Sequence, residues 1–173
     1  IKIILAFLLF DLWMYGWHRL NHRFPFFWRF HKVHHSDHEL DSTTALRFHP
    51  GEIFFSHVAN LGIIVFLGMD LTMLVIYKMI FVPVIVFHHS NIALPEKWDR
   101  VLRCILVTPQ MHRVHHSDLQ SETDSNYSSV LSWWDRIFAS FKRREDTRTI
   151  HFGLTDVSTQ RSRELTSLLK MPI

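Results

Sequence analysis

The 173-residue chain has a single cysteine, Cys104, and this scarcity limits the chemistry that it can carry. One thiol cannot build a disulfide framework, and it cannot supply the several thiolates of a cysteine-rich metal site. Any metal ion bound here must therefore take nitrogen or oxygen ligands. The chain also lacks a starting methionine and opens on Ile1 inside an apolar run, with no charged segment or cleavage site ahead of it. We therefore expect an excised segment from which earlier membrane spans are missing.

Two common metal-binding motifs are absent as well. The chain has no His-Glu-x-x-His, which excludes a zincin protease, and no Glu-x-x-His, the helix signature of carboxylate-bridged di-iron bundles. Net charge is only +3, acidic residues interleave with the basic ones, and no nucleic-acid-binding motif accompanies them. We therefore expect no nucleic-acid partner.

Long apolar runs, by contrast, are present at 1–17, 53–69 and 71–87. Each is close to the lower length limit for a helix that crosses a hydrocarbon layer of roughly 30 Å. Three buried helices of a soluble bundle are the alternative, but the strip around Lys78 is apolar on all sides and has no polar face. The sequence predicts an all-α integral membrane protein, with a truncated transmembrane helix at 1–17 and a transmembrane hairpin at 53–87 that turns at 68–70.

Polar segments separate and follow these runs, and the length favours a single domain over 1–173. Histidine-rich stretches occupy 18–52 and 88–141, and 142–173 forms a charged tail. Basic residues flank the apolar runs on what we expect to be one side, which the positive-inside rule places in the cytosol. They are Arg19, Arg23, Arg29, Lys32, Arg100, Arg103, Arg113, Lys142, Arg143 and Arg144. We therefore expect a cytosolic, histidine-rich helical domain that caps the spans, with a tail helix at 158–170 that either lies on the bilayer or packs as ordinary core.

Ten of the fourteen histidines fall into four boxes: HRLNH (18–22), HKVHH (31–35), HH (88–89) and HRVHH (112–116). Spacings of three and four residues place imidazoles on one face of a helix, and neutral imidazole suits iron, zinc, copper or nickel. Eight to ten ligands are too many for one ion, so the boxes predict two. The near-identical heptapeptides at 31–37 and 112–118 suggest two half-sites, which a hairpin of two crossings returns to the same side of the membrane.

The order HxxxH, HxxHH, HH-S-N and HxxHH, followed by ETDSNYSSVLSWWDRIF, resembles the fatty acid hydroxylase and sterol desaturase superfamily of membrane non-haem di-iron oxygenases. The match runs from about Asp11 to Phe141, and 34–50 is similar to the bacterial-type members. Ser128 and the FAS at 138–140 depart from the usual family pattern, which bears on loop geometry rather than on metal binding.

The resemblance implies a catalytic domain that binds two iron ions and uses O2. It also implies an external electron donor, NAD(P)H, through a reductase with a cytochrome b5-like or ferredoxin-like carrier. The bilayer location would be the inner membrane of a bacterium or the endoplasmic reticulum of a eukaryote. The metal ligands that it implies are His18, His22, His31, His34, His35, His89, His112, His115 and His116, with His88 as a tenth.

Polar residues near the boxes are candidates to orient these ligands. Asp11 and Tyr15 share one helix face with the first box, so we expect one of them to hydrogen-bond a ligand ring; a carboxylate at a truncated helix end is the alternative. Asp118, Asp124 and Asn126 follow the last box and would either orient its histidines or cap a loop.

The remaining histidines receive weaker assignments. His38 continues the face of the second box, but its counterpart in the repeat is Leu119, so we place it outside the ligand set. His49 is expected to hydrogen-bond a metal ligand, to line a substrate entrance or to have a structural role. His57 is expected to pack or hydrogen-bond locally, and no role is assigned to His151.

The sequence thus predicts an O2-dependent di-iron enzyme that hydroxylates or desaturates a sterol, fatty acyl, carotenoid or ether lipid. The alternatives are a non-enzymatic membrane protein that binds or transports zinc, and a structural protein stabilised by metal. Transporters place polar ligands midway through their spans, whereas every box here lies at or beyond a span end.

Overall fold

The computed structural model covers all 173 residues and is built from helices, with two isolated bridges as its only β contacts. The four longest helices are α1 (Lys2–Arg23), α2 (Pro25–His35), α3 (Pro50–Phe66) and α4 (Leu71–His89). The shorter ones are α5 (Glu96–Leu102), α6 (Pro109–His115), α7 (Gln120–Thr123), α8 (Trp133–Ile137), α9 (Thr159–Arg163) and α10 (Leu165–Lys170), with 3-10 turns η1 (Thr44–Leu46) and η2 (Thr147–Thr149). The predicted all-α class is confirmed.

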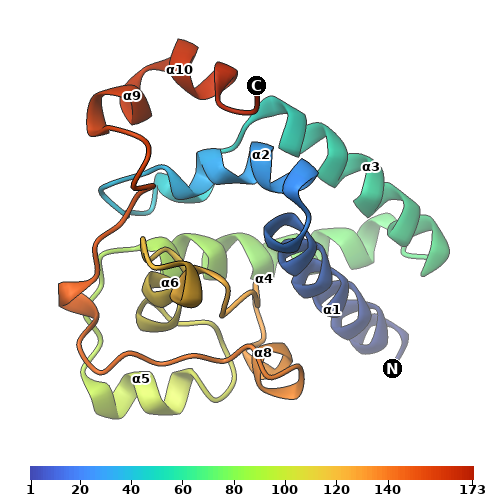
Figure 1. Cartoon of the computed structure of the whole chain (residues 1–173). Helices are drawn as coiled ribbons and strands as arrows, with labels where there is room; N and C mark the ends of the chain where they lie inside the picture. The colour runs from blue at the N-terminus through green and yellow to red at the C-terminus, as the bar shows by residue number, and fades with distance from the viewer.

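Helix α1 ends where the backbone extends at Phe24 (φ −100°, ψ 118°) and Pro25 begins α2. Proline disfavours helical geometry in the residue before it and suits the first position of a helix, so the chain breaks and restarts here. The break turns α2 across the end of α1 (Figure 1). As a result the HxxxH box on the last turns of α1 faces the HxxHH box on α2.

Helices α3 and α4 form the predicted hairpin, and each begins at a side-chain cap. His49 Nδ1 accepts a hydrogen bond from Gly51 N (2.9 Å), and Asp70 Oδ1 accepts one from Met73 N (2.9 Å). Gly68 makes the turn with φ +60°, a left-handed conformation that costs a residue with a side chain more than it costs glycine. From this turn the two helices diverge, and α1 packs against both of them (Figure 1).

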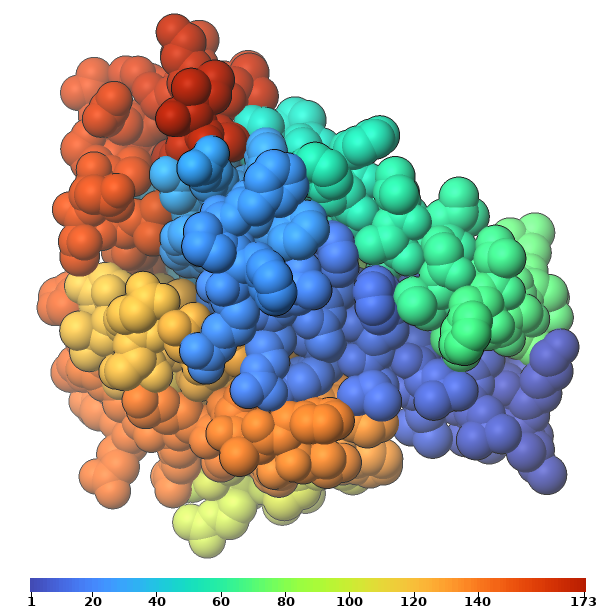
Figure 2. All heavy atoms as spheres, turned by 45° about the vertical axis from the view of Figure 1, so that its right-hand side comes forward, coloured from blue at the N-terminus to red at the C-terminus, as the bar shows by residue number.

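The apolar helices gather at one end of the molecule. Figure 2 shows the beginning of α1 beside the turn of the hairpin, far from the C-terminal tail. A small core forms there from Ala6, Phe10, Met69, Met73 and Tyr77. Helices α1 and α4 are long and apolar enough to cross a membrane by length and composition, whereas α3 is shorter. The predicted multi-pass topology and the predicted segment boundaries stay predictions.

The C-terminal tail folds back over α2 and the loop that follows it. Arg47 donates to the carbonyl of Ser162, and the Nε2 of His38 bonds to the carbonyl of Val157 (2.9 Å). The expected single helix at 158–170 is divided into α9 and α10 by an extended backbone at Glu164 (φ −92°, ψ 118°). Leu165 stays 69% exposed, so the apolar stripe of α10 is not core.

Candidate metal centre

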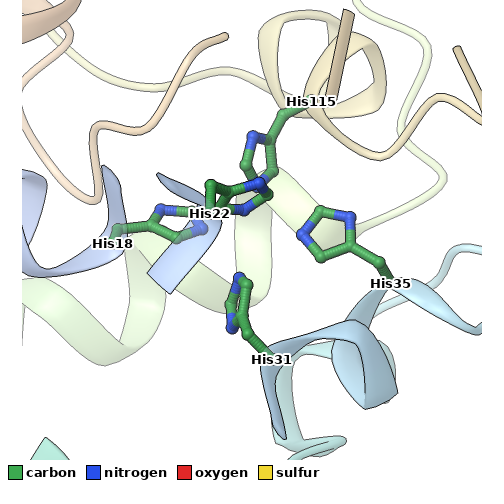
Figure 3. Close-up of side chains that lie close together, drawn as sticks. All are labelled: His18, His22, His31, His35 and His115. Atoms are coloured by element: carbon green, nitrogen blue, oxygen red, sulfur yellow. The ribbon is translucent and has the colours of Figure 1, made fainter. Parts of the chain in front are cut away.

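Nine of the ten predicted ligands lie in two groups, and within each group the potential ligand atoms are all within 4.8 Å of one another. The first group, which we call cluster 1, is drawn in Figure 3 and contains His18, His22, His31, His35 and His115. The second, cluster 2, contains His34, His89, His112 and His116. All of these residues are buried except His18, which is partly buried. The hairpin therefore brings the boxes before it and after it together, as its two crossings predict.

Each HxxHH box is divided between the clusters. In α2, His31 and His35 belong to cluster 1 and His34 to cluster 2. At the end of α6 the assignment is reversed, because His112 and His116 belong to cluster 2 and His115 to cluster 1. Residues i and i+4 project in nearly the same direction from a helix, whereas i+3 projects to one side of them. The predicted half-sites therefore exchange one histidine each, and neither cluster is complete without both boxes.

Backbone carbonyls set the proton position on four of the rings. The Nδ1 atoms of His18, His34, His89 and His115 lie 2.8, 3.2, 2.8 and 2.7 Å from the carbonyl oxygens of Tyr127, Arg47, Ile85 and Ser125, respectively. A carbonyl only accepts hydrogen bonds, so each Nδ1 carries the proton and each Nε2 is left with a lone pair. Metal-ligating histidines almost always donate their second ring nitrogen in this way.

A fifth ring is held by a carboxylate that sequence reasoning missed. His31 Nδ1 lies 2.6 Å from Glu52 Oε1, and both side chains are buried. Glu52 stands in the first turn of α3, at the edge of an apolar run that has little reason to contain a carboxylate. That position was the only signal in the sequence, and the partner became visible only once α2 and α3 were packed together.

The ring nitrogens fit a pair of cations. In cluster 2 the Nε2 atoms of His34 and His89 are 3.3 Å apart, and His112 Nε2 lies 2.9 Å from His89 Nε2. Because His34 and His89 carry their protons on Nδ1, their facing Nε2 atoms present two lone pairs and cannot hydrogen-bond to each other. In cluster 1 the Nε2 atoms of His18, His31 and His115 are buried without a partner. A cation at each cluster would satisfy these nitrogens.

Burial keeps these rings in the neutral form that binds metal. Desolvation, with the neighbouring imidazoles, lowers the pKa of His34, His35, His112 and His116 well below the usual value. Burial lowers the pKa of His115 to about 3, against the opposing hydrogen bond from its ring to Ser125. At neutral pH these side chains are therefore unprotonated at one ring nitrogen, as metal ligation requires.

His88, the tenth predicted ligand, lies beside cluster 2 but outside it. Its ring stacks on that of His112 with centroids 4.0 Å apart, and both of its nitrogens are buried without a partner. The structure therefore brings together nine of the predicted ligands and places His88 next to them.

Neither Asp11 nor Tyr15 hydrogen-bonds a histidine, contrary to the expectation from their shared helix face. Asp11 accepts hydrogen bonds from Leu131 N (3.0 Å), Trp134 Nε1 (2.8 Å) and Tyr77 Oη (3.3 Å), and so ties α1 to α4 and to the start of α8. The alternative of a carboxylate at a helix end fails too, because Asp11 is fully buried inside α1. Its role in the structure is to join helices.

Tyr15 acts at a distance through a second buried carboxylate that sequence reasoning missed. Its hydroxyl bonds to Ser140 Oγ (2.8 Å), which donates to Asp135 Oδ1 (2.8 Å). Asp135 also accepts from the backbone nitrogen of Tyr127 (2.8 Å), the residue whose carbonyl holds His18. Desolvation raises the pKa of Asp135, and its hydrogen bonds oppose that rise. Asp135 thereby orders the loop that orients a cluster 1 ligand.

The residues after the last box divide between the two roles expected of them. Asn126 adopts φ +50° and donates to the carbonyls of Met111 (3.0 Å) and Lys142 (2.8 Å), which positions the helix that carries the last box. Asp124 Oδ1 lies 3.8 Å from His22 Nδ1 in cluster 1. The carboxylate of Asp118 contacts no histidine, and its backbone nitrogen donates to His151 O (2.9 Å).

The other histidines lie outside both clusters. His38 contacts the tail, His49 caps α3, and His57 Nδ1 bonds to Ile53 O (2.7 Å) in its own helix. His38 therefore stands apart from the ligands, and His49 has a structural role.

An apolar cavity of about 530 Å³ adjoins the clusters and extends between α1, α3 and α4. Cluster 1 reaches its wall through His18 and His31, and cluster 2 reaches it through His34, His89 and His112. Farther along, the wall is made by apolar residues such as Phe10, Met14, Ile64 and Leu74. A long apolar molecule inside it would therefore end against the histidine nitrogens.

Two all-histidine clusters at the end of such a cavity make this a helical protein of the histidine-box class with a candidate metal centre. The fatty acid hydroxylase family model matches residues 3–140, and the chain belongs to this family. The chain is 30% identical to alkylglycerol monooxygenase of Homo sapiens, with 87% of this chain and 32% of that protein covered. It is 27% identical to ornithine lipid hydroxylase OlsE of Rhizobium tropici (89% and 46%) and 24% identical to human cholesterol 25-hydroxylase (81% and 51%).

The chain thus spans about a third of the length of the alkylglycerol monooxygenases and about half that of the other two relatives. No solved structure matches it.

Proposed function

We propose that the chain carries the active site of an O2-dependent di-iron enzyme that hydroxylates a membrane lipid at an unactivated C–H bond. The observation that carries this proposal is the direct continuity between the apolar cavity and the two histidine clusters. The relatives support it, since their names describe a monooxygenase of alkylglycerols and hydroxylases of ornithine lipid and cholesterol. Desaturation of the same bond is the other outcome that such a site allows.

In this proposal each cluster would hold one iron ion, and bound iron would supply the activation of O2 and the removal of hydrogen from carbon. The chain supplies the rest. Carbonyls and Glu52 hold the ring protons on Nδ1, so the Nε2 atoms stay directed inward. The apolar wall of the cavity would align the lipid so that its target carbon meets the clusters. Electrons would come from NAD(P)H through a reductase and a carrier protein.

The proposed setting is a membrane, with the clusters at its cytosolic face. Helices α1 and α4 are the candidate spans, and they carry His18, His22 and His89 near their C-terminal ends. Exposed apolar side chains cover the far end of the hairpin, including Leu61, Val65, Phe66 and Leu71. A lipid could therefore enter the cavity from the bilayer and remain in an apolar environment until it reaches the metals.

The test uses purified protein supplied with iron, O2, a reductant and a lipid extract of the host. We expect two irons per chain and a lipid product heavier by one oxygen, or lighter by two hydrogens if the bond is desaturated. Two zinc ions and unchanged lipids under reducing, iron-replete conditions would instead support the zinc-binding alternative. A matched sample reconstituted with zinc alone should bind the same lipids and convert none.

A further inference from the structure

Two hydrogen bonds between side chains join α1 to α3, one helical turn apart. Trp13 Nε1 donates to Asn60 Oδ1 (2.8 Å), and Trp17 Nε1 donates to Ser56 Oγ (2.9 Å). The partner on α3 moves back by four residues as α1 advances by four, so the two helices run side by side in opposite directions (Figure 1). These two pairs fix the register of α1 against α3.

One turn closer to the clusters, the same register places Asn21 of α1 opposite Glu52 of α3. Both side chains line the cavity, and both are buried, at 3% and 7% exposed. Unlike the two pairs before them, they form no hydrogen bond with each other. The amide of Asn21 has no hydrogen-bond partner in the chain, and Glu52 Oε2 is buried without one. Buried polar groups are nearly always hydrogen-bonded, so this third pair points to a partner from outside the chain.

The third pair lies beside cluster 1. Glu52 bonds to His31 through its other oxygen, Oε1, at 2.6 Å. Asn21 follows His18 by three residues, which is about 4.5 Å along the axis of α1. His18 and His31 are both cluster 1 residues, with ring centroids 5.1 Å apart. A group held between Asn21 and Glu52 would therefore lie where the apolar cavity meets the histidines.

An amide and a carboxylate together select a group that both donates and accepts a hydrogen bond. Glu52 Oε2 only accepts, whereas the amide nitrogen of Asn21 donates. A hydroxyl group satisfies both. An ether oxygen accepts from the amide and leaves Oε2 unpaired, an ammonium leaves the amide N–H groups unpaired, and an anionic group is repelled by Glu52.

We infer that Asn21 and Glu52 bind a hydroxyl group of the lipid, which donates to Glu52 Oε2 and accepts from the Asn21 amide. The substrate class is then a long-chain lipid with a hydroxyl group close to the carbon that is attacked. This assignment of the attacked carbon rests on the proposed function. The attacked carbon stays the same number of bonds from the hydroxyl group when the alkyl chain is lengthened at its far end.

Binding is measured without turnover, on zinc-reconstituted protein in nanodiscs, through displacement of a fluorescent long-chain alcohol. The probes are a long-chain alcohol, its methyl ether and the alkane of the same chain length, and empty nanodiscs correct for their partitioning into the bilayer. We expect wild-type protein to bind the alcohol at least about tenfold more tightly than the ether, because only the alcohol donates to the charged carboxylate.

Asn21→Leu replaces the amide with an apolar side chain of similar size. It should weaken binding of the alcohol about fivefold, since one hydrogen bond to the hydroxyl oxygen is lost, and leave binding of the alkane unchanged. Ser56→Ala is the matched control, because it removes the hydrogen bond of the neighbouring pair and should keep the affinity for the alcohol. Both variants should retain two zinc ions per chain.

The inference is overturned if wild-type protein binds the ether as tightly as the alcohol, a result that would assign the third pair to a bound water molecule. It is also overturned if Asn21→Leu binds the alcohol as wild type does. An equal loss in Ser56→Ala would attribute the effect to helix packing and reject the hydroxyl site. The wild-type comparison stands even if Asn21→Leu fails to fold.

These results separate the inference from the proposed function, since zinc-reconstituted protein turns over no lipid. A preference for the alcohol that depends on Asn21, with no lipid oxidised under iron-replete conditions, would retain the binding site and reject the enzyme. Iron-dependent lipid oxidation by a protein that binds the alcohol and the ether equally would retain the enzyme and reject the binding site.

Discussion

Single hydrogen bonds decide how the histidines are presented at this site. Five rings donate from Nδ1, four of them to carbonyls and one to the carboxylate of Glu52. A carbonyl fixes the tautomer, whereas a carboxylate also makes the ring a better electron donor to a metal. Glu52 is therefore the contact outside the ligand set whose removal should change metal binding most.

Substitution of Glu52 should weaken metal binding without removing a ligand. We expect Glu52→Ala to lower metal affinity about 10–100-fold, since that is the usual effect of losing such a partner. The metal affinity of Glu52→Gln should lie between those of the wild type and Glu52→Ala, because the glutamine carbonyl oxygen still accepts a hydrogen bond from His31 but carries no charge. Affinity is measured by competition with a chelator, with Glu39→Gln on the exposed surface as the control. Unchanged affinity in Glu52→Ala would show that the contact does not tune the metal.

Residue patterns predicted which histidines gather in the clusters better than they predicted the hydrogen-bond partners of the site residues. Spacings of three and four identified the histidines of both HxxHH boxes, because helical periodicity is local. The partner of Asp11 could not be found in the same way, since Leu131 and Trp134 are more than a hundred residues away in the chain. Most of the hydrogen-bond acceptors at the rings are backbone carbonyls, which every residue has and no sequence pattern reveals.

At the scale of elements, helix ends and breaks create the site. The break at Pro25 sets α2 across α1, and the turn at Gly68 returns α4 to the clusters. The hairpin and its turn were predictable from the apolar runs and from Gly68 itself. The exchange of His34 and His115 between clusters was not, because it depends on the angle at which α2 and α6 meet.

The turn of the hairpin offers a direct test of backbone geometry. Gly68→Ala forces a side chain into a left-handed conformation and should destabilise the protein by about 1–2 kcal/mol. Gly62→Ala is the matched control in the interior of α3, where nothing crowds a new Cβ, and it should be neutral or stabilising by up to about 1 kcal/mol. Thermal or denaturant unfolding in detergent gives both values. Equal stability of the two variants would contradict the assigned turn.

At the scale of the molecule, the clusters make folding depend on pH. Burial lowers the folded-state pKa values of His34, His35, His112 and His116 well below the usual 6.5, and that of His115 to about 3. The unfolded chain therefore binds more protons than the folded chain between these values. Stability is fully present above pH 6.5 and is lost as pH falls toward 3, by up to about 1.4 kcal/mol per pH unit for each such histidine.

Acidification should therefore release the metal and lower the melting temperature together, because protons and metal ions compete for the same nitrogens. Both are followed from pH 7.5 to pH 5, by metal content after desalting and by thermal unfolding. Stability that is constant over this range in the metal-free protein would contradict the burial of neutral histidines.

The whole molecule joins two environments, an apolar hairpin and a histidine domain, through one cavity. In the sequence, the apolar runs and the histidine-rich segments are separate, so the hairpin and the histidine domain could be predicted from composition. The cavity could not, because its lining residues come from α1, α3 and α4 and form one wall only when these helices are packed.

The most direct test of the paired clusters is the number of iron ions per folded chain, measured by elemental analysis of protein purified under reducing, iron-replete conditions. Two irons per chain are expected, because cluster 1 and cluster 2 each offer at least four inward-facing imidazoles. One iron per chain, or zinc in both sites under these conditions, would contradict a di-iron centre.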